Sequence, residues 1–246
     1  SPVSDNAVQA EAAQFVPYSA EEMYTSWSPL PSIGHEPRVL FGAAPRSIID
    51  TYVHVLDEAK LEVVRLELES LALARGVLPA NYHGVSIILD LGTTRSTLVL
   101  VVDSVVHFTT TLRYSGKDLD TYIAESLSIS ADQARRAKEV FGLDPEKGKG
   151  LLAKILGPQL EALTSEIMKV QHFAKEHVTD RPVDQVFLTG GGAQMRGMAD
   201  ALGKNLNIPV EPQPVPLVAL LPALDDADDV SYTYATAIGL AMEGAV

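Results

Sequence analysis

The sequence predicts an α/β protein with a mixed β-sheet, and three observations support that class. Short runs of β-branched and apolar residues alternate along the chain with segments of helical periodicity. Two consecutive apolar runs meet at Asp103-Ser104, which indicates a hairpin in the middle of the chain. The 246 residues include 46% hydrophobic and 21% charged residues, a balance typical of a globular protein with a sizeable core. Strands joined by helices on either side of a hairpin give a sheet with both parallel and antiparallel pairs.

Composition excludes several classes of function. The formal net charge of -13 opposes non-specific binding to nucleic acid or to anionic lipid. The absence of cysteine excludes disulfides and thiolate metal sites, and the six histidines lack metal-ligand spacing. The most apolar runs, 85–102 and 215–224, contain charges or prolines and are poor membrane spans. We therefore expect no nucleic-acid partner and no direct membrane insertion. The chain opens at Ser1-Pro2 rather than at Met, which is typical of a processed or shortened start.

The first third of the chain predicts a loop-rich start followed by alternating strands and helices. Residues 1–10 are small and polar, so we expect a frayed entry. Ser19 followed by Glu22 resembles a capping box. Prolines and a glycine predict a loop over Pro29–Pro37. The next elements are a strand at Arg38–Ala44, a helix at Pro45–Glu58, a strand at Leu61–Leu66 and a helix at Glu69–Leu78 closed by Gly76 and Pro79.

The remaining elements follow in order from apolar runs and from capping residues. Predicted strands are Val85–Leu91, Arg95–Val102, Val105–Leu112, Val183–Leu188 and a short edge strand at Pro209-Val210. Predicted helices are Gly116–Leu127, Ser130–Phe141 between caps Ser130 and Gly142, Leu151–Val178 interrupted at Gly157-Pro158, Gly197–Leu206 and Tyr232–Met242. Connecting segments are Lys147–Lys149, Pro212–Pro222 and the acidic cluster Asp225–Asp229, which we interpret as a solvated loop.

A glycine turn follows the most apolar strand, in the segment SIILDLGTTRST. Gly92 lets the backbone approach a phosphate closely, and Asp90 at the strand end can hold magnesium through water or orient an attacking water. Hydroxyl groups that could donate to phosphate oxygens are those of Thr93, Thr94, Ser96 and Thr97. A plain hairpin turn explains the same residues equally well, because short glycine motifs match by chance.

A second glycine turn follows a later strand, at Gly190, Gly191 and Gly192. Three consecutive glycines allow a flat backbone against which a purine or ribose can lie. Alone, the motif is better explained as a flexible strand-to-helix loop. The two motifs together, roughly a hundred residues apart, have the spacing of the actin-like superfamily.

The chain resembles the C-terminal two-thirds of the PilM family, the cytoplasmic actin-like proteins of type IV pilus assembly, and more distantly the cell-division protein FtsA. The stretches that carry the resemblance are Glu11–Glu22, Val39–Leu56, Glu67–Ala74, Ile87–Val101, Ser130–Lys138, Val186–Met198 and Tyr234–Met242. The resemblance implies an actin-like (ribonuclease H-like) ATPase fold with two lobes, a small accessory subdomain, and ATP with Mg²⁺ in the cleft.

The resemblance also implies how this chain is divided. Residues 1–37 form part of the accessory subdomain, 38–84 the rest of the first lobe with the linking helix, 85–230 the second lobe, and 231–246 a helix returning to the first lobe. An N-terminal phosphate loop does not occur in the sequence, so the fold is expected to be N-terminally incomplete, either because the chain is a fragment or because it is a reduced member of the family. We therefore expect weak ATP–Mg²⁺ binding, or none, by this chain alone.

Three charged residues gain roles from the resemblance. Glu69 falls on the linking helix, where related ATPases place the residue that positions the attacking water. The preferred alternative is that Glu69 only stabilises the start of its helix by interacting with the helix dipole, because Glu67 is nearby and equally available to position the water. Lys138 matches a lysine of the adenosine-contacting helix, and Arg135 replaces the family's glutamate, although Arg can stack on a purine. A solvated charged face explains Arg135 and Lys138 at least as well.

The resemblance implies an adaptor that binds the N-terminal tail of a PilN-like inner-membrane protein in a groove beside the accessory subdomain. The resemblance also implies the pilus motor or other assembly proteins as partners, and it leaves self-association open. The adaptor would be cytoplasmic and peripheral to the inner membrane. Two alternatives remain: a turning-over ATPase that uses Asp90 and Glu69, and a cell-division or type II secretion relative. The changed adenosine helix favours the adaptor.

Overall fold

The computed structural model describes residues 3–16, 19–33, 36–215 and 231–243. It divides into two compact units, Ser1–Leu68 and Glu69–Val246, which are treated separately below. The predicted loop Asp225–Asp229 and most of the predicted connector Pro212–Pro222 lie outside the described residues. The four-part division into lobes stays a prediction. Among the described residues, no helix combines the length and the apolar character needed to cross a membrane.

The first unit is built on a two-stranded antiparallel sheet. Strands β1 (Met23–Ile33) and β2 (Glu36–Pro45) pair from Met23 opposite Pro45 to Ile33 opposite Glu36. Its helices are α1 (Asp5–Ala12), the 3-10 turn η1 (Ala20–Glu22) and α2 (Arg46–Glu58). The prediction of β2 and α2 is confirmed. The frayed start predicted for residues 1–10 is wrong over α1, because the Ser4 hydroxyl caps the N–H of Ala7.

Two further predictions for this unit are wrong. Pro29–Pro37 is not a loop, because β1 runs through Pro29 and Pro31. Both strands of a two-stranded sheet are edge strands, and an edge tolerates a residue without an N–H. Leu61–Leu66 is not a strand either, and Val64 is 85% exposed. Strand-forming residues do not make a strand unless another strand pairs with them.

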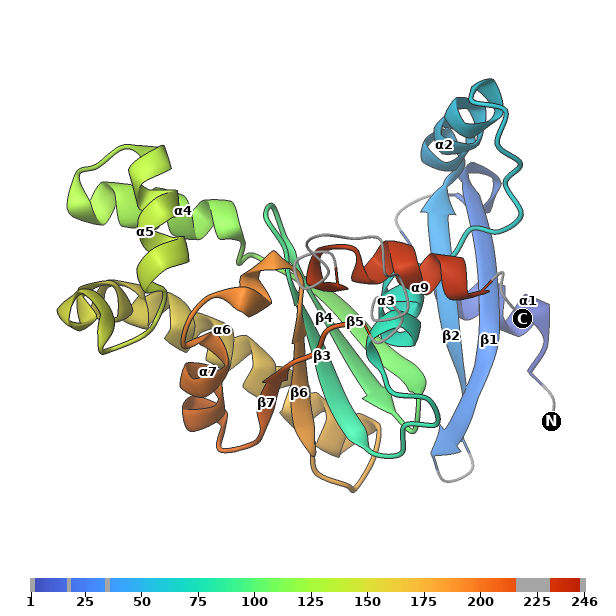
Figure 1. Ribbon diagram of the computed structural model, residues 1–246. Helices are drawn as coiled ribbons and strands as arrows, with labels where there is room; N and C mark the ends of the chain where they lie inside the picture. The colour runs from blue at the N-terminus through green and yellow to red at the C-terminus, as the bar shows by residue number, and fades with distance from the viewer. Residues whose placement is uncertain (1–2, 17–18, 34–35, 216–230, 244–246) are drawn as a thin grey trace. The chain divides into compact units, whose positions relative to one another are not determined.

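The second unit contains a five-stranded mixed sheet in the order β5-β4-β3-β6-β7, which confirms the predicted class (Figure 1). Strands β3 (Val85–Leu91), β4 (Ser96–Val102) and β5 (Val105–Leu112) are antiparallel, whereas β6 (Gln185–Thr189) and β7 (Val210–Pro212) run parallel to β3. Asp103 and Ser104 both have positive φ, 49° and 67°. That geometry is the type I′ turn that joins strands in a tight hairpin.

Helices cover both faces of this sheet, as Figure 1 shows. One face carries α4 (Gly116–Leu127), α5 (Ala131–Phe141), α6 (Leu151–His177) and α7 (Met198–Leu206), with the η3 turn (Gly191–Gln194) at the end of β6. The other face packs against α3 (Glu69–Val77) and α9 (Ala235–Glu243). The predicted caps of α5 are confirmed, with a full capping box between Ser130 and Gln133.

The predicted interruption of the long helix at Gly157-Pro158 is wrong. Helix α6 continues through Pro158, which is exposed. A proline inside a helix removes one N–H donor and crowds the preceding turn. Buried Leu152, Leu156 and Leu163 lie on both sides of the proline and are part of the main core. Their packing holds the helix in one piece.

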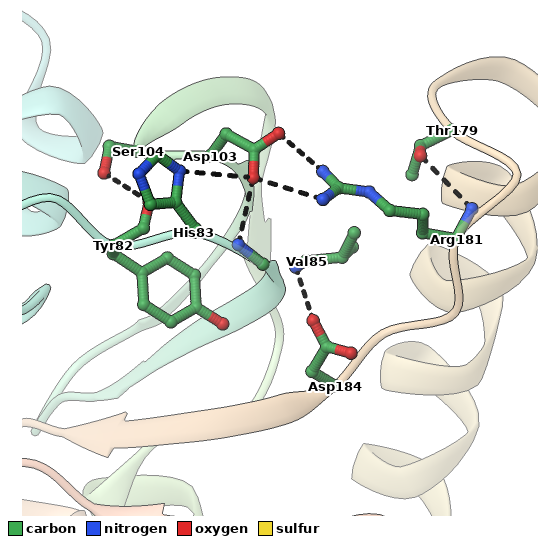
Figure 2. Close-up of polar contacts among 9 residues, drawn as sticks. Tyr82, His83, Val85, Asp103, Ser104, Thr179, Arg181 and Asp184 are labelled. Carbon is green, nitrogen blue, oxygen red and sulfur yellow. Dashed lines mark hydrogen bonds and ion pairs between the residues drawn. The ribbon is translucent and has the colours of Figure 1, made fainter.

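At the end of the sheet where β3 begins, a polar cluster joins three connections (Figure 2). Arg181, between α6 and β6, donates two hydrogen bonds to Asp103 of the hairpin turn, at 3.2 and 2.7 Å. The Gly84 N–H donates to the same carboxylate at 3.0 Å, and Asp184 accepts from the Val85 N–H at 2.8 Å. The hydrogen bonds from Arg181 hold the pKa of Asp103 below its usual range. These contacts fix where β3, β5 and β6 start.

Candidate functional site

A cavity of about 600 Å³ lies at the opposite end of this sheet, within the second unit. Its volume is typical of sites that bind small ligands. The walls come from the β3–β4 turn, the N-terminal half of α4, one face of α5 and the η3 turn after β6. The lining residues are Leu91, Gly92, Thr93, Ser96, Tyr114, Gly116, Lys117, Leu119, Asp120, Arg135, Lys138, Glu139, Gly191, Gly192, Gln194, Met195 and Met198.

The cavity brings seven of the sequence-predicted residues together and leaves five outside its lining. Those inside are Gly92, Thr93, Ser96, Arg135, Lys138, Gly191 and Gly192. Those outside are Asp90, Thr94, Thr97, Gly190 and Glu69. The two glycine motifs, far apart in the sequence, therefore meet at one cavity because β3 and β6 are adjacent parallel strands.

The turn at Gly92 is tied to the start of helix α4. The Gly92 carbonyl accepts from the Gly116 N–H at 3.0 Å, and the Thr93 carbonyl accepts from the Lys117 N–H at 2.9 Å. A Cβ on Gly92 would stand 2.5 Å from the Arg95 carbonyl oxygen. The turn itself therefore requires glycine, whatever ligand it also serves. The Ser96 hydroxyl donates to the Tyr114 carbonyl at 2.6 Å and supports the fold there.

The three glycines after β6 have different tasks. Gly190 has φ +76°, and a side chain there would overlap the carboxylate of Asp90. A Cβ on Gly192 would lie 2.6 Å from the Cβ of Leu91. Both glycines are therefore needed for the loop to approach the end of β3. A Cβ on Gly191, by contrast, would meet no atom within 4 Å, and this residue lines the cavity. Of these three positions, Gly191 is the one at which packing does not require glycine.

Helix α5 contributes two basic residues with different surroundings. Lys138 Nζ lies 2.7 Å from Asp120 Oδ1 and donates to the Gly116 carbonyl at 2.9 Å. Arg135 pairs with Glu139 at 3.0 Å, and its side chain is 69% exposed. Arg135 therefore matches the solvated-face interpretation, although it also lines the cavity. Lys138 does not, because its side chain is only 17% exposed.

Asp90 lies on the other face of the sheet from the cavity. Side chains alternate along a strand, so Asp90 shares its face with Ile88, which packs in the cluster below α3 and α9. Leu91, the next residue, lines the cavity. Thr97 and Thr189 are the partners of Asp90 on the neighbouring strands. The end of β3 therefore presents a carboxylate to one face and a cavity wall to the other.

Glu69 and Arg95 lie close to Asp90. Glu69 opens helix α3, and its Oε2 accepts a hydrogen bond from Arg95 Nη2 at 2.8 Å. Burial, and secondly the negative charge of Glu69, raise the pKa of Asp90 to about 6, while the charge of Arg95 opposes that shift. Carboxyl groups with raised pKa values cluster at functional sites. Among the described residues, no group of three or more metal-binding side chains is present.

Sequence reasoning missed several residues of the cavity wall. Lys117 and Asp120 begin helix α4, and Gln194, Met195 and Met198 follow the triple glycine. The available signal was sequence proximity, since the latter three come directly after the second glycine turn. The wall therefore combines glycine backbone, basic side chains and apolar Met side chains. Such a surface can hold an anionic group at one end and a flat apolar ring at the other.

Solved structures with similar folds place this arrangement in the actin-like class. The chain is similar to a PilM-PilN type IV pilus biogenesis complex, with 24% identity and a TM-score of 0.76, covering 98% of this chain and 72% of that one. It is similar to MreB5 of Spiroplasma citri bound to AMPPNP, with 14% identity, a TM-score of 0.58, and 82% and 68% covered. EutJ from Carboxydothermus hydrogenoformans gives 22% identity, a TM-score of 0.55, and 78% and 60% covered. The predicted actin-like fold is confirmed.

Residues 4–245 match the family model of the type IV pilus assembly protein PilM. The chain therefore belongs to the PilM family, an actin-like family of type IV pilus assembly proteins, and the predicted resemblance is confirmed.

We expect Asp90→Asn to stabilise the ligand-free protein at pH 7.5. The folded-state pKa of about 6 lies above the ordinary 3.8, so ionising the Asp90 carboxyl group costs free energy in the folded protein. The ligand-free protein therefore loses stability as the pH rises from about 4 through 6, and above pH 6 it bears the whole cost. An amide avoids this penalty, and the gain should be about 2 kcal/mol at pH 7.5 and near zero below pH 4. Urea unfolding at the two pH values measures it.

Asp200→Asn is the matched control, because Asp200 is an exposed carboxylate at the start of α7. Its replacement should change stability by no more than about 0.5 kcal/mol at either pH. An Asp90→Asn protein that is no more stable than the unaltered chain at pH 7.5 would contradict the burial argument.

Proposed function

We propose that the cavity binds the adenosine part of ATP and that the two glycine turns hold its phosphates. Gly191 carries this proposal, because it alone of three consecutive glycines faces open space at the cavity while its neighbours pack the loop onto β3. Lys117 adds positive charge to the wall, whereas the charge of Arg135 is paired with Glu139, which lines the cavity too. The neighbour MreB5 was solved with AMPPNP bound, which supports a nucleotide site in this fold.

Magnesium fits this proposal through the phosphates. Mg²⁺ prefers an octahedral shell of oxygen atoms and commonly takes one or two carboxylates, with water and phosphate oxygens completing the shell. Asp90 is the carboxylate that would hold it, because although it lies on the other face of the sheet from the cavity, its carboxylate lies against Gly190 of the second glycine turn. When bound, the ion would neutralise phosphate charge. Glu69 would stand near it, as the residue that orients water in a hydrolytic relative.

The protein function that we propose is that of an adaptor. The chain would bind the N-terminal tail of a PilN-like inner-membrane protein and couple it to the other pilus assembly proteins. Support comes from the fold neighbour described as a PilM-PilN complex, which covers 98% of this chain. Its location would be cytoplasmic, at the inner membrane through that partner. Nucleotide in the cavity would bias the conformation that the partner meets.

We expect Gly191→Ala and Gly191→Leu to weaken MgATP binding in steps while leaving the fold intact. The added side chain meets no protein atom within 4 Å of its Cβ, so the free energy of unfolding should change by less than about 0.5 kcal/mol. In the cavity the same atoms occupy ligand space, and the leucine variant should lose at least about tenfold in affinity. Calorimetric titration with MgATP measures the affinity of both variants and of the unaltered protein.

Gly203→Ala in α7 is the control for adding a methyl group to a glycine. Its Cβ would make an ordinary 3.5 Å contact with the Ile208 carbonyl, away from the cavity. MgATP affinity should match that of the unaltered protein. If the Gly191→Leu protein binds MgATP as tightly as the unaltered protein does, the ligand does not lie against the loop that contains Gly191.

The adaptor proposal predicts that the protein binds a synthetic peptide with the N-terminal sequence of a PilN-like inner-membrane protein from the same organism. Peptide tails that dock on a folded groove commonly bind with micromolar dissociation constants, about -8 kcal/mol. Fluorescence anisotropy of the labelled peptide measures the affinity, and a scrambled peptide of the same composition is the control. Equal binding of both peptides, or binding of neither, would contradict the adaptor proposal.

A further inference from the structure

The side chain of Lys138 is held by protein atoms at its charged end. Its Nζ lies 2.7 Å from Asp120 Oδ1 and 2.9 Å from the Gly116 carbonyl oxygen. The Lys138 and Asp120 side chains are only 17% and 18% exposed. A partly desolvated ion pair that also makes a hydrogen bond is stronger than an exposed one. The ammonium group of Lys138 is therefore held by helix α4 through one hydrogen bond, to the Gly116 carbonyl, and one ion pair, to Asp120.

The Gly116 carbonyl belongs to the same peptide group as the Lys117 N–H. That N–H donates to the Thr93 carbonyl at 2.9 Å, and the Gly116 N–H donates to the Gly92 carbonyl at 3.0 Å. A cation at the oxygen of a peptide group polarises it and strengthens its N–H as a donor. One continuous chain of hydrogen bonds thus runs from Lys138 through the Gly116–Lys117 peptide to the turn at Gly92 and Thr93.

The three elements also meet at close range around Gly116. A Cβ built there would lie 3.4 Å from Lys138 Nζ, 3.5 Å from Thr93 Cα and 3.7 Å from the Gly92 carbonyl oxygen. The absence of a side chain at this position lets α5, α4 and the turn approach one another. Arg135, one turn earlier on α5, pairs with Glu139 on its own helix instead.

We propose that Lys138 is a positioning residue for the phosphate turn. It holds the backbone at Gly92 and Thr93 in place before any ligand binds, acting through Asp120 and the Gly116–Lys117 peptide. Preorganising a binding loop lowers the entropy that binding must overcome. The consequence for nucleotide affinity rests on the proposed function, whereas the consequence for the turn itself does not.

The first experiment measures amide hydrogen exchange in the ligand-free protein. Lys138→Met leaves the Asp120 carboxylate unpaired, so the main variant is the double replacement Lys138→Met with Asp120→Leu, which removes both charges together. The amides of Gly116 and Lys117 should exchange about tenfold faster or more in this variant, because their acceptors in the turn are no longer held. The central-strand amide of Leu89 should keep its protection.

Arg135→Met is the matched control, since it removes a basic side chain from the same helix without touching this hydrogen-bond chain. Its Gly116 and Lys117 amides should exchange as in the unaltered protein. Unchanged exchange of these two amides in the double variant would overturn the proposal. So would a loss of protection at Leu89 as large as that at Lys117, because it would indicate general unfolding.

The second experiment measures how tightly the unaltered protein and the same double variant bind three probes: MgATP, inorganic pyrophosphate and adenosine. A residue that acts through the phosphate turn should, when lost, weaken MgATP and pyrophosphate by about tenfold and leave adenosine unchanged. An equal loss for adenosine would assign Lys138 to direct contact with the nucleoside and overturn the proposal. If the unaltered protein binds none of the probes, the nucleotide proposal fails, and the exchange experiment still decides the role of Lys138.

Discussion

The close approach of the loop after β6 to the end of β3 is the constraint on which the site depends. Parallel pairing sets Asp90 opposite Thr189, so β6 ends one residue before β3 at the same edge of the sheet. The loop can then continue past β3 only because Gly190 takes a positive φ and Gly192 has no side chain to meet Leu91. That approach brings the two glycine turns to one cavity and leaves Gly191 facing it.

The same strand end serves two faces of the sheet. Leu91 belongs to the wall of the cavity, whereas Asp90 lies on the face covered by α3 and α9. Those two helices cross at Gly76 and Gly239, where any side chain would overlap the backbone of the other helix. Arg75 fastens the crossing by donating to the Gly239 carbonyl at 2.8 Å. A ligand that spans the strand end would therefore connect the cavity to a closely packed helix pair.

The sequence predicts most of the second unit because its signals there are local. Val85–Leu91 and Val105–Leu112 are bounded by turn residues, and Ser130 caps its helix, so their limits match the structure. Leu61–Leu66 and Pro29–Pro37 were predicted wrongly because strand formation depends on a partner elsewhere in the chain. The helix through Pro158 likewise depends on core packing.

The site was predictable in its motifs but not in the tasks of single residues. The pattern of three glycines gives no means of separating Gly191 from its neighbours, since the difference lies in their distances to β3. The ion pair between Lys138 and Asp120 joins two helices, and no pattern in the sequence indicates it.

Backbone NMR during titration with MgATP tests most directly the central claim that MgATP binds at the two glycine turns. The account predicts the largest amide shifts at Thr93 and Gly191, and shifts confined to residues 3–68 would contradict it.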